Sequence, residues 1–268
     1  MLLCLDVGNT HIFGGVFQSS QKDNDSPILR FRCATNLVGT SDQFGIFLLQ
    51  ILQTHQVTLE SITDVAICSV VPSYDYTIKH AITQYFKAKL FILQAGVKTG
   101  LNVKYKNPNE VGADRIANAI GAVSAFPNKN LIIIDTGTAT TVCAISKNKD
   151  YLGGAILPGM RLAMDSLKNN AAKLTEVNIE IPSTYIGRST KESMQSGLYY
   201  AQLGALKEII SGFKREAFKE GETLVIGTGG FSQLFKEKQL YDVWLPDLVL
   251  QGLFKAYHYS LQAEDKVV

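Results

Sequence analysis

The chain contains 268 residues, of which 46% are hydrophobic, and its 26 basic and 24 acidic side chains leave a net charge of +2. This length and composition predict one large or two smaller globular domains with a substantial core. The balanced charge argues against binding to nucleic acid or an acidic membrane by charge alone, and no apolar stretch approaches the ~18 residues of a membrane helix.

The first half of the chain is expected to form three strands followed by alternating helices and strands. Leu2–Leu5 is continuously apolar, which is typical of a strand buried on both faces. Apolar residues at helical spacing predict a helix over Ser41–Gln53, and the polar segment 18–27 is expected to be a loop. The other expected elements are strands at residues 11–17, 28–34, 64–71 and 90–93, and a helix at residues 73–86.

The second half repeats this order after a helix expected over residues 115–126. Ser189 and Glu192 have the spacing of a capping box at the start of a long helix. The expected strands are residues 131–135, 140–146, 151–157 and 223–230, and the expected helices are residues 160–167, 190–218, 232–238 and 247–257. The repeat predicts a duplicated α/β domain with a cleft between the copies, divided into residues 1–115 and 116–268.

Two acidic turns that begin Asp-x-Gly and contain threonine follow equivalent apolar strands, at Asp6–Thr10 and Asp135–Thr141. Glycine lets the backbone approach a ligand, and successive N–H groups with a hydroxyl suit a phosphate. A carboxylate would repel phosphate unless a hard cation lies between them. Each turn could also be a simple hairpin turn, but two matching copies favour a polyphosphate and metal site.

A third glycine turn, Gly227–Gly230, also follows an expected strand. It could hold an adenosine ring against bare backbone, or it could simply link a strand to a helix. The chain has no Walker A motif, no dinucleotide fingerprint after a strand and no protein-kinase signature set.

The four cysteines are isolated, without a CxxC pair or a Cys/His cluster, so a zinc site is not expected. Reduced, buried thiols fit a cytoplasmic protein. The first residues are too short an apolar run, and lack the basic flank, for a signal peptide.

Six segments in the order "DVGNT", "KTGL", "NPNEVGADRIANAIGA", "IDTGTATT", "GGAILPG" and "STKESMQSG" resemble the type III pantothenate kinases. These enzymes belong to the acetate and sugar kinase/actin-like ATPase superfamily, and the resemblance runs from Met1 to about Leu253. It implies an α/β fold of duplicated RNase H-like domains with a nucleotide cleft between them. It also implies ATP-dependent phosphorylation of pantothenate to 4'-phosphopantothenate, the first step of coenzyme A biosynthesis, by a homodimer.

The resemblance assigns roles to individual positions. It implies Mg²⁺ with the ATP and a monovalent cation, K⁺ or NH₄⁺, at Asp135. It places a further substrate contact, Thr190, at or across the dimer interface. Around pantothenate it places Tyr105, Gly112, Ala113, Asp114 and Arg115. The residues that it places along the ATP phosphates are Asp6, Val7, Gly8, Asn9, Thr10, His11, Ile12, Phe13 and Thr138. Some related sequences carry a lysine near the end of the first turn, where this chain reads His11-Ile12-Phe13.

Asp114 is the expected catalytic base, because phosphoryl transfer needs a carboxylate that orients the hydroxyl and accepts its proton late. It could instead cap the helix that follows. Arg115 could fork onto a carboxylate or phosphate, or form a structural ion pair. Tyr105 could contact the pantoyl group or simply pack, and Thr190 could be part of a helix cap.

Two other functions stay open at this point. One is a transcriptional regulator like the Bvg accessory factor of the same family, although no basic stripe or helix-turn-helix is evident. The other is a kinase of the same fold that acts on another small hydroxy compound, since fold alone does not fix a substrate. Intact acidic turns and "GADR" favour pantothenate kinase.

Overall fold

The computed structural model describes residues 1–18, 26–219 and 221–264, so residues 19–25 of the expected loop lie outside the described part. The chain forms two compact units. The first contains residues 1–125 together with the chain from Asp247 onward, and the second contains residues 126–246. Among the described helices, none is long and apolar enough to cross a membrane.

The first unit is built on a five-stranded sheet in the order β3-β2-β1-β4-β5. Strand β1 pairs antiparallel with β2 and parallel with β4, so β1 occupies the centre. The strands are β1 (Leu2–Val7), β2 (His11–Phe17), β3 (Leu29–Ala34), β4 (Asp64–Ser69) and β5 (Lys89–Leu93). The other elements are the helices α1 (Ser41–Thr54), α2 (Pro72–Tyr85), α3 (Ala113–Ala125) and α6 (Leu248–Glu264), and the short strand β6 (Asn102–Val103).

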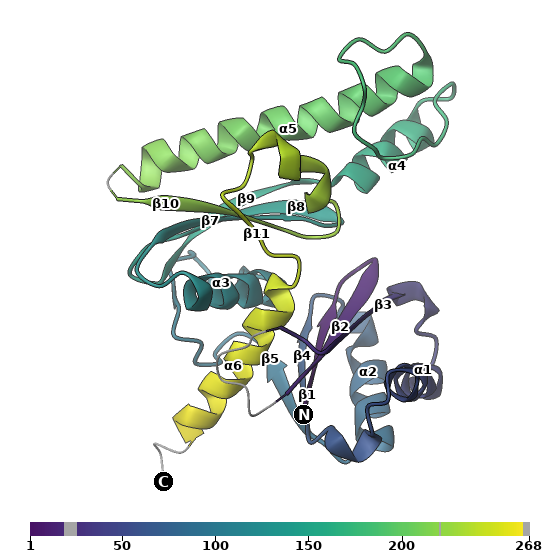
Figure 1. Cartoon of the computed structure of the whole chain (residues 1–268), viewed down its shortest axis with the longest axis vertical. Coiled ribbons are helices and arrows are strands. Elements are labelled where there is room, and N and C mark those ends of the chain that lie inside the picture. The colour runs from purple at the N-terminus through teal and green to yellow at the C-terminus, as the bar shows by residue number, and fades with distance from the viewer. Residues whose placement is uncertain (19–25, 220, 265–268) are drawn as a thin grey trace. The chain divides into compact units, whose positions relative to one another are not determined.

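Both faces of this sheet are covered, as the continuously apolar first strand predicts. Alternate residues of a strand point to opposite faces. Leu3 and Leu5 therefore pack in the cluster of α1 and α2, whereas Leu2 and Cys4 pack in the cluster of α3 and α6. Figure 1 shows α1 and α2 on one side of the sheet and α6 on the other.

The second unit repeats this arrangement with strands in the order β11-β10-β7-β8-β9. Its central strand β7 pairs antiparallel with β8 and parallel with β10. The strands are β7 (Asn130–Thr136), β8 (Ala139–Ile145), β9 (Asp150–Pro158), β10 (Thr223–Thr228) and β11 (Val243–Trp244). The helices are α4 (Met160–Asn170) and α5 (Thr190–Ala217), followed by a 3-10 helix, η4 (Ser232–Lys238).

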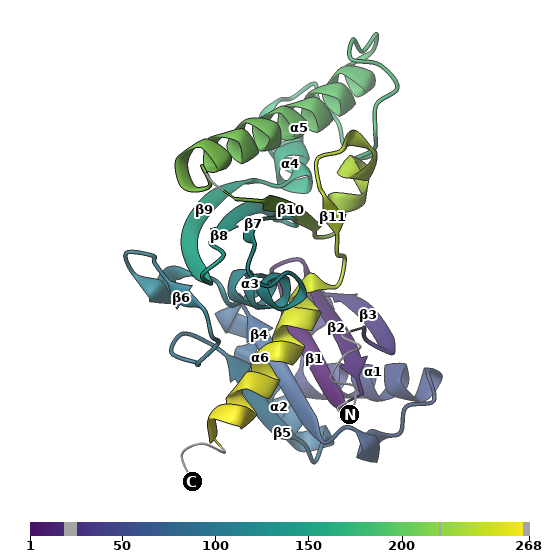
Figure 2. The same cartoon turned by 60° about the vertical axis from the view of Figure 1, so that its left-hand side comes forward.

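Helices α4 and α5 lie over the same face of the second sheet (Figure 2). The core there is formed by Ile132 and Ile134 of β7 with Leu198 and Leu206 of α5. At the start of α5 the Ser189 hydroxyl accepts from the Glu192 N–H, as the capping box predicts. The Glu192 carboxylate, however, accepts from the N–H of Arg188 instead of Ser189.

The shared strand order of the two sheets confirms the predicted duplicated α/β fold. Most expected elements are present within a few residues, and β6 and β11 are additional short strands. The compact units differ from the expected domains 1–115 and 116–268, because α3 and α6 both pack on the first sheet. Sequence order could not show that the last helix returns to the first unit. The nucleotide cleft between the copies stays a prediction.

Candidate active site

The first acidic turn joins the central strand β1 to β2. The N–H of Gly8 donates to the carbonyl of His11 over 3.1 Å, and Thr35 fixes the turn by donating its hydroxyl to the Gly8 carbonyl over 2.7 Å. Asn9 is exposed at the tip. The side chains of Val7 and Ile12 are fully buried in the core. Besides the half-buried Asp6 carboxylate, only the exposed tip and backbone groups of this segment are therefore open to a ligand.

Asp6 and Asp114 lie near the same end of the first sheet. In the parallel ladder of β1 and β4, Asp6 pairs with Cys68, and the Cys68 Sγ donates to Asp6 Oδ1 over 3.4 Å. Burial raises the pKa of the Cys68 thiol, and the nearby charges of Asp6 and Asp114 raise it further. The charges of Asp6 and Asp114 therefore both affect one buried thiol, which lies near the carboxyl ends of β1 and β4.

Asp114 stands in the first turn of α3, one residue after the helix begins at Ala113. Its Oδ1 accepts from the Arg115 N–H over 2.7 Å. Burial raises the pKa of the Asp114 carboxyl above its ordinary value, and the hydrogen bond and charge of Arg115 offset part of that rise. A Cβ on Gly112 would lie 2.5 Å from Asp114 Oδ1, so only glycine leaves room for the carboxylate.

The remaining residues expected around pantothenate surround Asp114. The Arg115 side chain is 6% exposed, and its guanidinium lies 5.6 Å from the centre of the Tyr105 ring. Arg115 thus presents a buried cation beside a half-buried aromatic ring. The structure therefore brings Tyr105, Gly112, Asp114 and Arg115 together, and their role in binding pantothenate stays a prediction.

The second acidic turn joins β7 to β8 in the second unit. Gly137 donates to the Ala139 carbonyl over 3.1 Å, and Thr138 is exposed at the tip. The N-cap of α4, Gly159, donates to the Thr138 carbonyl over 3.1 Å. The positive end of the α4 dipole therefore lies against this turn, which favours an anion there.

Asp135 is flanked by the third glycine turn. Gly229 has a φ of +92°, and a Cβ there would overlap Asp135 Oδ1 and the Thr136 N–H. Burial raises the pKa of the Tyr241 hydroxyl, and the nearby Asp135 charge raises it further. Gly229 thus lets the third glycine turn pack directly against Asp135 and Thr136, which a side chain at this position would prevent.

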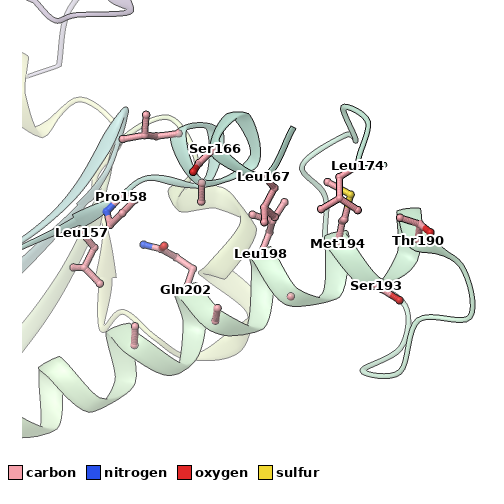
Figure 3. Close-up of a pocket in the computed structure, with 15 residues that line it drawn as sticks. Leu157, Pro158, Ser166, Leu167, Leu174, Thr190, Ser193, Met194, Leu198 and Gln202 are labelled. Atoms are coloured by element: carbon pink, nitrogen blue, oxygen red, sulfur yellow. The ribbon is translucent and has the colours of Figure 1, made fainter. Parts of the chain in front are cut away.

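A wide apolar groove lies between α4 and α5, with a volume of about 1080 Å³. Figure 3 shows Thr190 and Ser193 at one end of it and the Gln202 amide near Pro158 at the other. The Gln202 Nε2 is buried without a hydrogen-bond partner. Thr190 is therefore an exposed residue on the rim of an apolar surface, and the neighbouring Ser189 provides the helix cap.

The predicted site residues thus form three groups: Asp6–Phe13 with the pantothenate residues around Asp114, Asp135 with Thr138, and Thr190 at the groove. Among the described residues, no cluster of three or more His, Cys, Asp or Glu side chains could hold a metal ion alone. Any divalent cation would therefore depend on ligand oxygens from phosphate.

Sequence reasoning missed Cys68, Tyr241 and Gln202. Cys68 could have been found, because it lies near the end of an expected apolar strand, and pairing that strand parallel to β1 places its last residues beside Asp6. Tyr241 comes from a loop after η4 and reaches Asp135 only through tertiary packing. Gln202 looks like any polar residue within a long helix, so no sequence signal marked it.

The sequence comparisons cover most of the chain. The sequence model of the family described as "Type III pantothenate kinase" matches residues 2–212. A type III pantothenate kinase of Legionella pneumophila strain Paris is 56% identical over 253 residues, covering 94% of this chain and 96% of that protein. Type III pantothenate kinase 1 of Francisella tularensis subsp. holarctica strain OSU18 is 46% identical, covering 94% and 97%.

Solved structures show the same fold at much lower identity. A Campylobacter jejuni protein, provisionally described as a Baf family transcriptional activator, aligns with a TM-score of 0.59 at 16% identity, covering 97% of this chain and 99% of that chain. A Sinorhizobium meliloti protein, provisionally described as a 2-dehydro-3-deoxygalactonokinase, aligns with a TM-score of 0.54 at 10% identity, covering 98% and 99%. These likenesses confirm the sugar kinase/actin-like ATPase fold and nothing finer.

Proposed function

Because the chain belongs to the type III pantothenate kinase family, it is a pantothenate kinase, and we propose that Asp114 is its catalytic base. It transfers the terminal phosphoryl group of ATP to the primary hydroxyl of pantothenate, giving 4'-phosphopantothenate for coenzyme A synthesis. The observation that carries the assignment of Asp114 is its burial at the head of α3, beside Arg115, with a raised pKa.

Asp114 would act in two ways. It would orient the pantothenate hydroxyl, and it would accept the proton as the new oxygen–phosphorus bond forms and the bond to ADP breaks. Phosphoryl transfer has a loose transition state, so the hydroxyl becomes acidic late. The raised pKa makes Asp114 a better proton acceptor than an exposed carboxylate.

The remaining pantothenate residues would recognise the substrate. Arg115 would hold the pantothenate carboxylate with its planar guanidinium, because that geometry allows two parallel hydrogen bonds. Tyr105 would pack on the pantoyl group, since it already lies against Arg115. Gly112 and Ala113 would contribute backbone groups next to Asp114.

The two acidic turns would bind the ATP phosphates. Asp6–Phe13 would contribute the Asp6 carboxylate, backbone groups and the side chains at its tip, because Val7 and Ile12 are buried. Thr138 would donate its exposed hydroxyl, supported by the N-terminus of α4 at Gly159. The chain has no lysine at the first turn, so charge neutralisation there would come from cations and backbone.

The cation assignments are part of the same proposal. Asp135, a half-buried carboxylate near the end of β7, would hold a monovalent cation, K⁺ or NH₄⁺, through its oxygens. Mg²⁺ would accompany ATP and neutralise its β- and γ-phosphate charge. It would need few protein ligands, in keeping with the absence of an acidic cluster among the described residues.

We further propose that the enzyme is a homodimer and that a second copy covers the groove between α4 and α5. Two large exposed apolar side chains, Leu162 and Leu167, line this groove. Exposed patches of this kind mark protein contacts. Thr190 on the rim would then contact substrate at or across the interface. The cysteines, which form no disulfide among the described residues, fit a cytoplasmic enzyme, and no nucleic-acid partner is proposed.

Turnover with an acceptor panel tests the function. Protein, ATP, Mg²⁺ and K⁺ should give ADP and 4'-phosphopantothenate when pantothenate is added, as measured by coupled ADP detection and mass spectrometry. Turnover on another hydroxy acid or sugar in preference to pantothenate would instead support a different kinase. The regulator alternative gains no support from the Campylobacter jejuni structure, because 16% identity shows only the fold.

A further inference from the structure

Cys68 lies beside Asp6, the acidic residue near the end of β1. It is fully buried, and it lies opposite Asp6 in the parallel ladder of β1 and β4. Its Sγ donates to Asp6 Oδ1 over 3.4 Å. The side-chain torsions of an aspartate at a strand end depend on its contacts. The Cys68 thiol therefore limits the directions in which the Asp6 carboxylate can point.

The thiol also lies near Asp114, since the charges of Asp6 and Asp114 both raise the pKa of Cys68 after burial does so. A thiol in this setting stays protonated and remains a donor. A neutral thiol can donate a hydrogen bond to the Asp6 carboxylate. Because it carries no charge, it does not shift the pKa of Asp114 as a charged donor would.

The second unit has a matching pair. Thr228 lies opposite Asp135 in the parallel ladder of β10 and β7, as Cys68 lies opposite Asp6. Thr228 is 2% exposed, so it is also a short, buried side chain with a hydrogen to donate. Both copies of the fold thus place a small donor residue beside the acidic residue of the central strand.

We propose that Cys68 is a positioning residue, whose thiol holds the Asp6 carboxylate in the orientation that MgATP binding requires. This inference rests on the proposed function, because it takes Asp6 to act on the nucleotide. A thiol is a weak donor, so its loss should weaken MgATP binding by about five- to tenfold. Pantothenate affinity should hardly change, because Cys68 has no contact with Arg115 or Tyr105 in the structure's hydrogen bonds.

Three variants test this inference: Cys68→Val, Cys68→Ser and Cys4→Val. Valine removes the donor and keeps the volume, whereas serine keeps a donor. Cys4 is the matched control, because it is fully buried two residues before Asp6, in the same ladder and core cluster as Cys68. We expect a fivefold or larger rise in the Kd and KM for MgATP with Cys68→Val only, with the pantothenate KM within twofold of wild type.

The readouts separate this inference from the function itself. Calorimetric binding of MgATP needs no acceptor, so it tests Cys68 even if pantothenate proves to be the wrong substrate. Unchanged MgATP binding in Cys68→Val, an equal loss in Cys68→Ser, or the same loss in Cys4→Val would each overturn the positioning role. A wild-type protein that binds no MgATP would overturn it too. If Cys68→Val does not fold, Cys68→Ala removes the same donor without adding bulk.

Discussion

Asp6 and Asp135 occupy the same position in two sheets of the same strand order: each is the penultimate residue of the central strand, before a tight turn into an antiparallel partner. Each also faces a small buried residue across a parallel ladder. The repeated sequence pattern therefore reflects a repeated structural position. The predictions below ask what each copy does.

Replacing Asp114 with Asn should lower kcat by about 10²-fold or more, which is the range for a general base. The amide keeps the shape of the side chain but cannot accept the proton. Steady-state kinetics with pantothenate would measure the loss. Asp64 lies at the end of β4 that is remote from Cys68 and Asp114. Asp64→Asn is therefore the matched control and should keep full activity. Substantial turnover by Asp114→Asn would remove Asp114 from the role of base.

The same substitution should make the protein more stable at neutral pH. Burial raises the pKa of Asp114 in the folded state, so ionisation disfavours folding as pH rises above the unfolded value of ~4. Asp114→Asn removes that cost, and its Tm should exceed that of wild type at pH 8. The gain should shrink as pH falls toward 4. Thermal melts at several pH values give the comparison, and a lower Tm for Asp114→Asn at pH 8 would contradict it.

Activity should follow the ionisation of the same group. The value of kcat/KM for pantothenate should fall on the acidic side, because protonated Asp114 cannot act as a base. The raised pKa places this fall above the range of an exposed aspartate. A pH–rate profile measures it, with coupling enzymes in excess at each pH. A profile flat down to pH 4 would speak against Asp114.

Asp135→Asn should remove the response to K⁺. The neutral amide has lost the charge that holds a monovalent cation, so the KM for ATP should rise about tenfold, the equivalent of ~1.4 kcal/mol. Turnover with K⁺ and with choline at equal ionic strength separates cation binding from screening. If Asp135→Asn still responds to K⁺ as wild type does, the cation lies elsewhere.

Gly229→Ala should destabilise the fold by about 1–3 kcal/mol, through strain at positive φ and overlap with Asp135. Two controls divide these causes. Gly96 has a φ of +91° but open space around its Cβ position, so Gly96→Ala reports strain alone. Gly230 has open space and no positive φ, so Gly230→Ala should be nearly neutral. Chemical denaturation gives all three values, and equal losses in Gly229→Ala and Gly96→Ala would rule out the overlap.

Leu167→Asp should convert the dimer to a monomer. Leu167 lines the groove and is 38% exposed, so a charge there should hardly affect the core but should disrupt a covering copy. Leu37→Asp, 73% exposed in the first unit, is the control and should stay dimeric. Sedimentation velocity measures both, and a dimeric Leu167→Asp would place the interface elsewhere.

The sequence predicts much of this molecule because its main signals are local. Continuous apolar strands gave β1 and β7, helical spacing gave α1 and α2, and Ser189 marked the start of α5. The arrangement around Asp114 was predicted through the resemblance of its motif.

Contacts made by packing were not predictable in this way. Cys68 meets Asp6 through strand pairing, and Tyr241 approaches Asp135 from a loop more than a hundred residues later in the chain. The return of α6 to the first sheet has no local signal either, because its apolar face fits any core.

That return governs how the protein can be made. Leu250, Leu253 and Phe254 complete the core behind β1, yet they are translated only after the whole second unit. The second unit is continuous in sequence, so it can fold during synthesis before α6 is translated. The first unit cannot cover one face of its sheet until α6 has been made. Premature termination before α6 would therefore leave an aggregation-prone, protease-sensitive product, even though it would contain every proposed active-site residue.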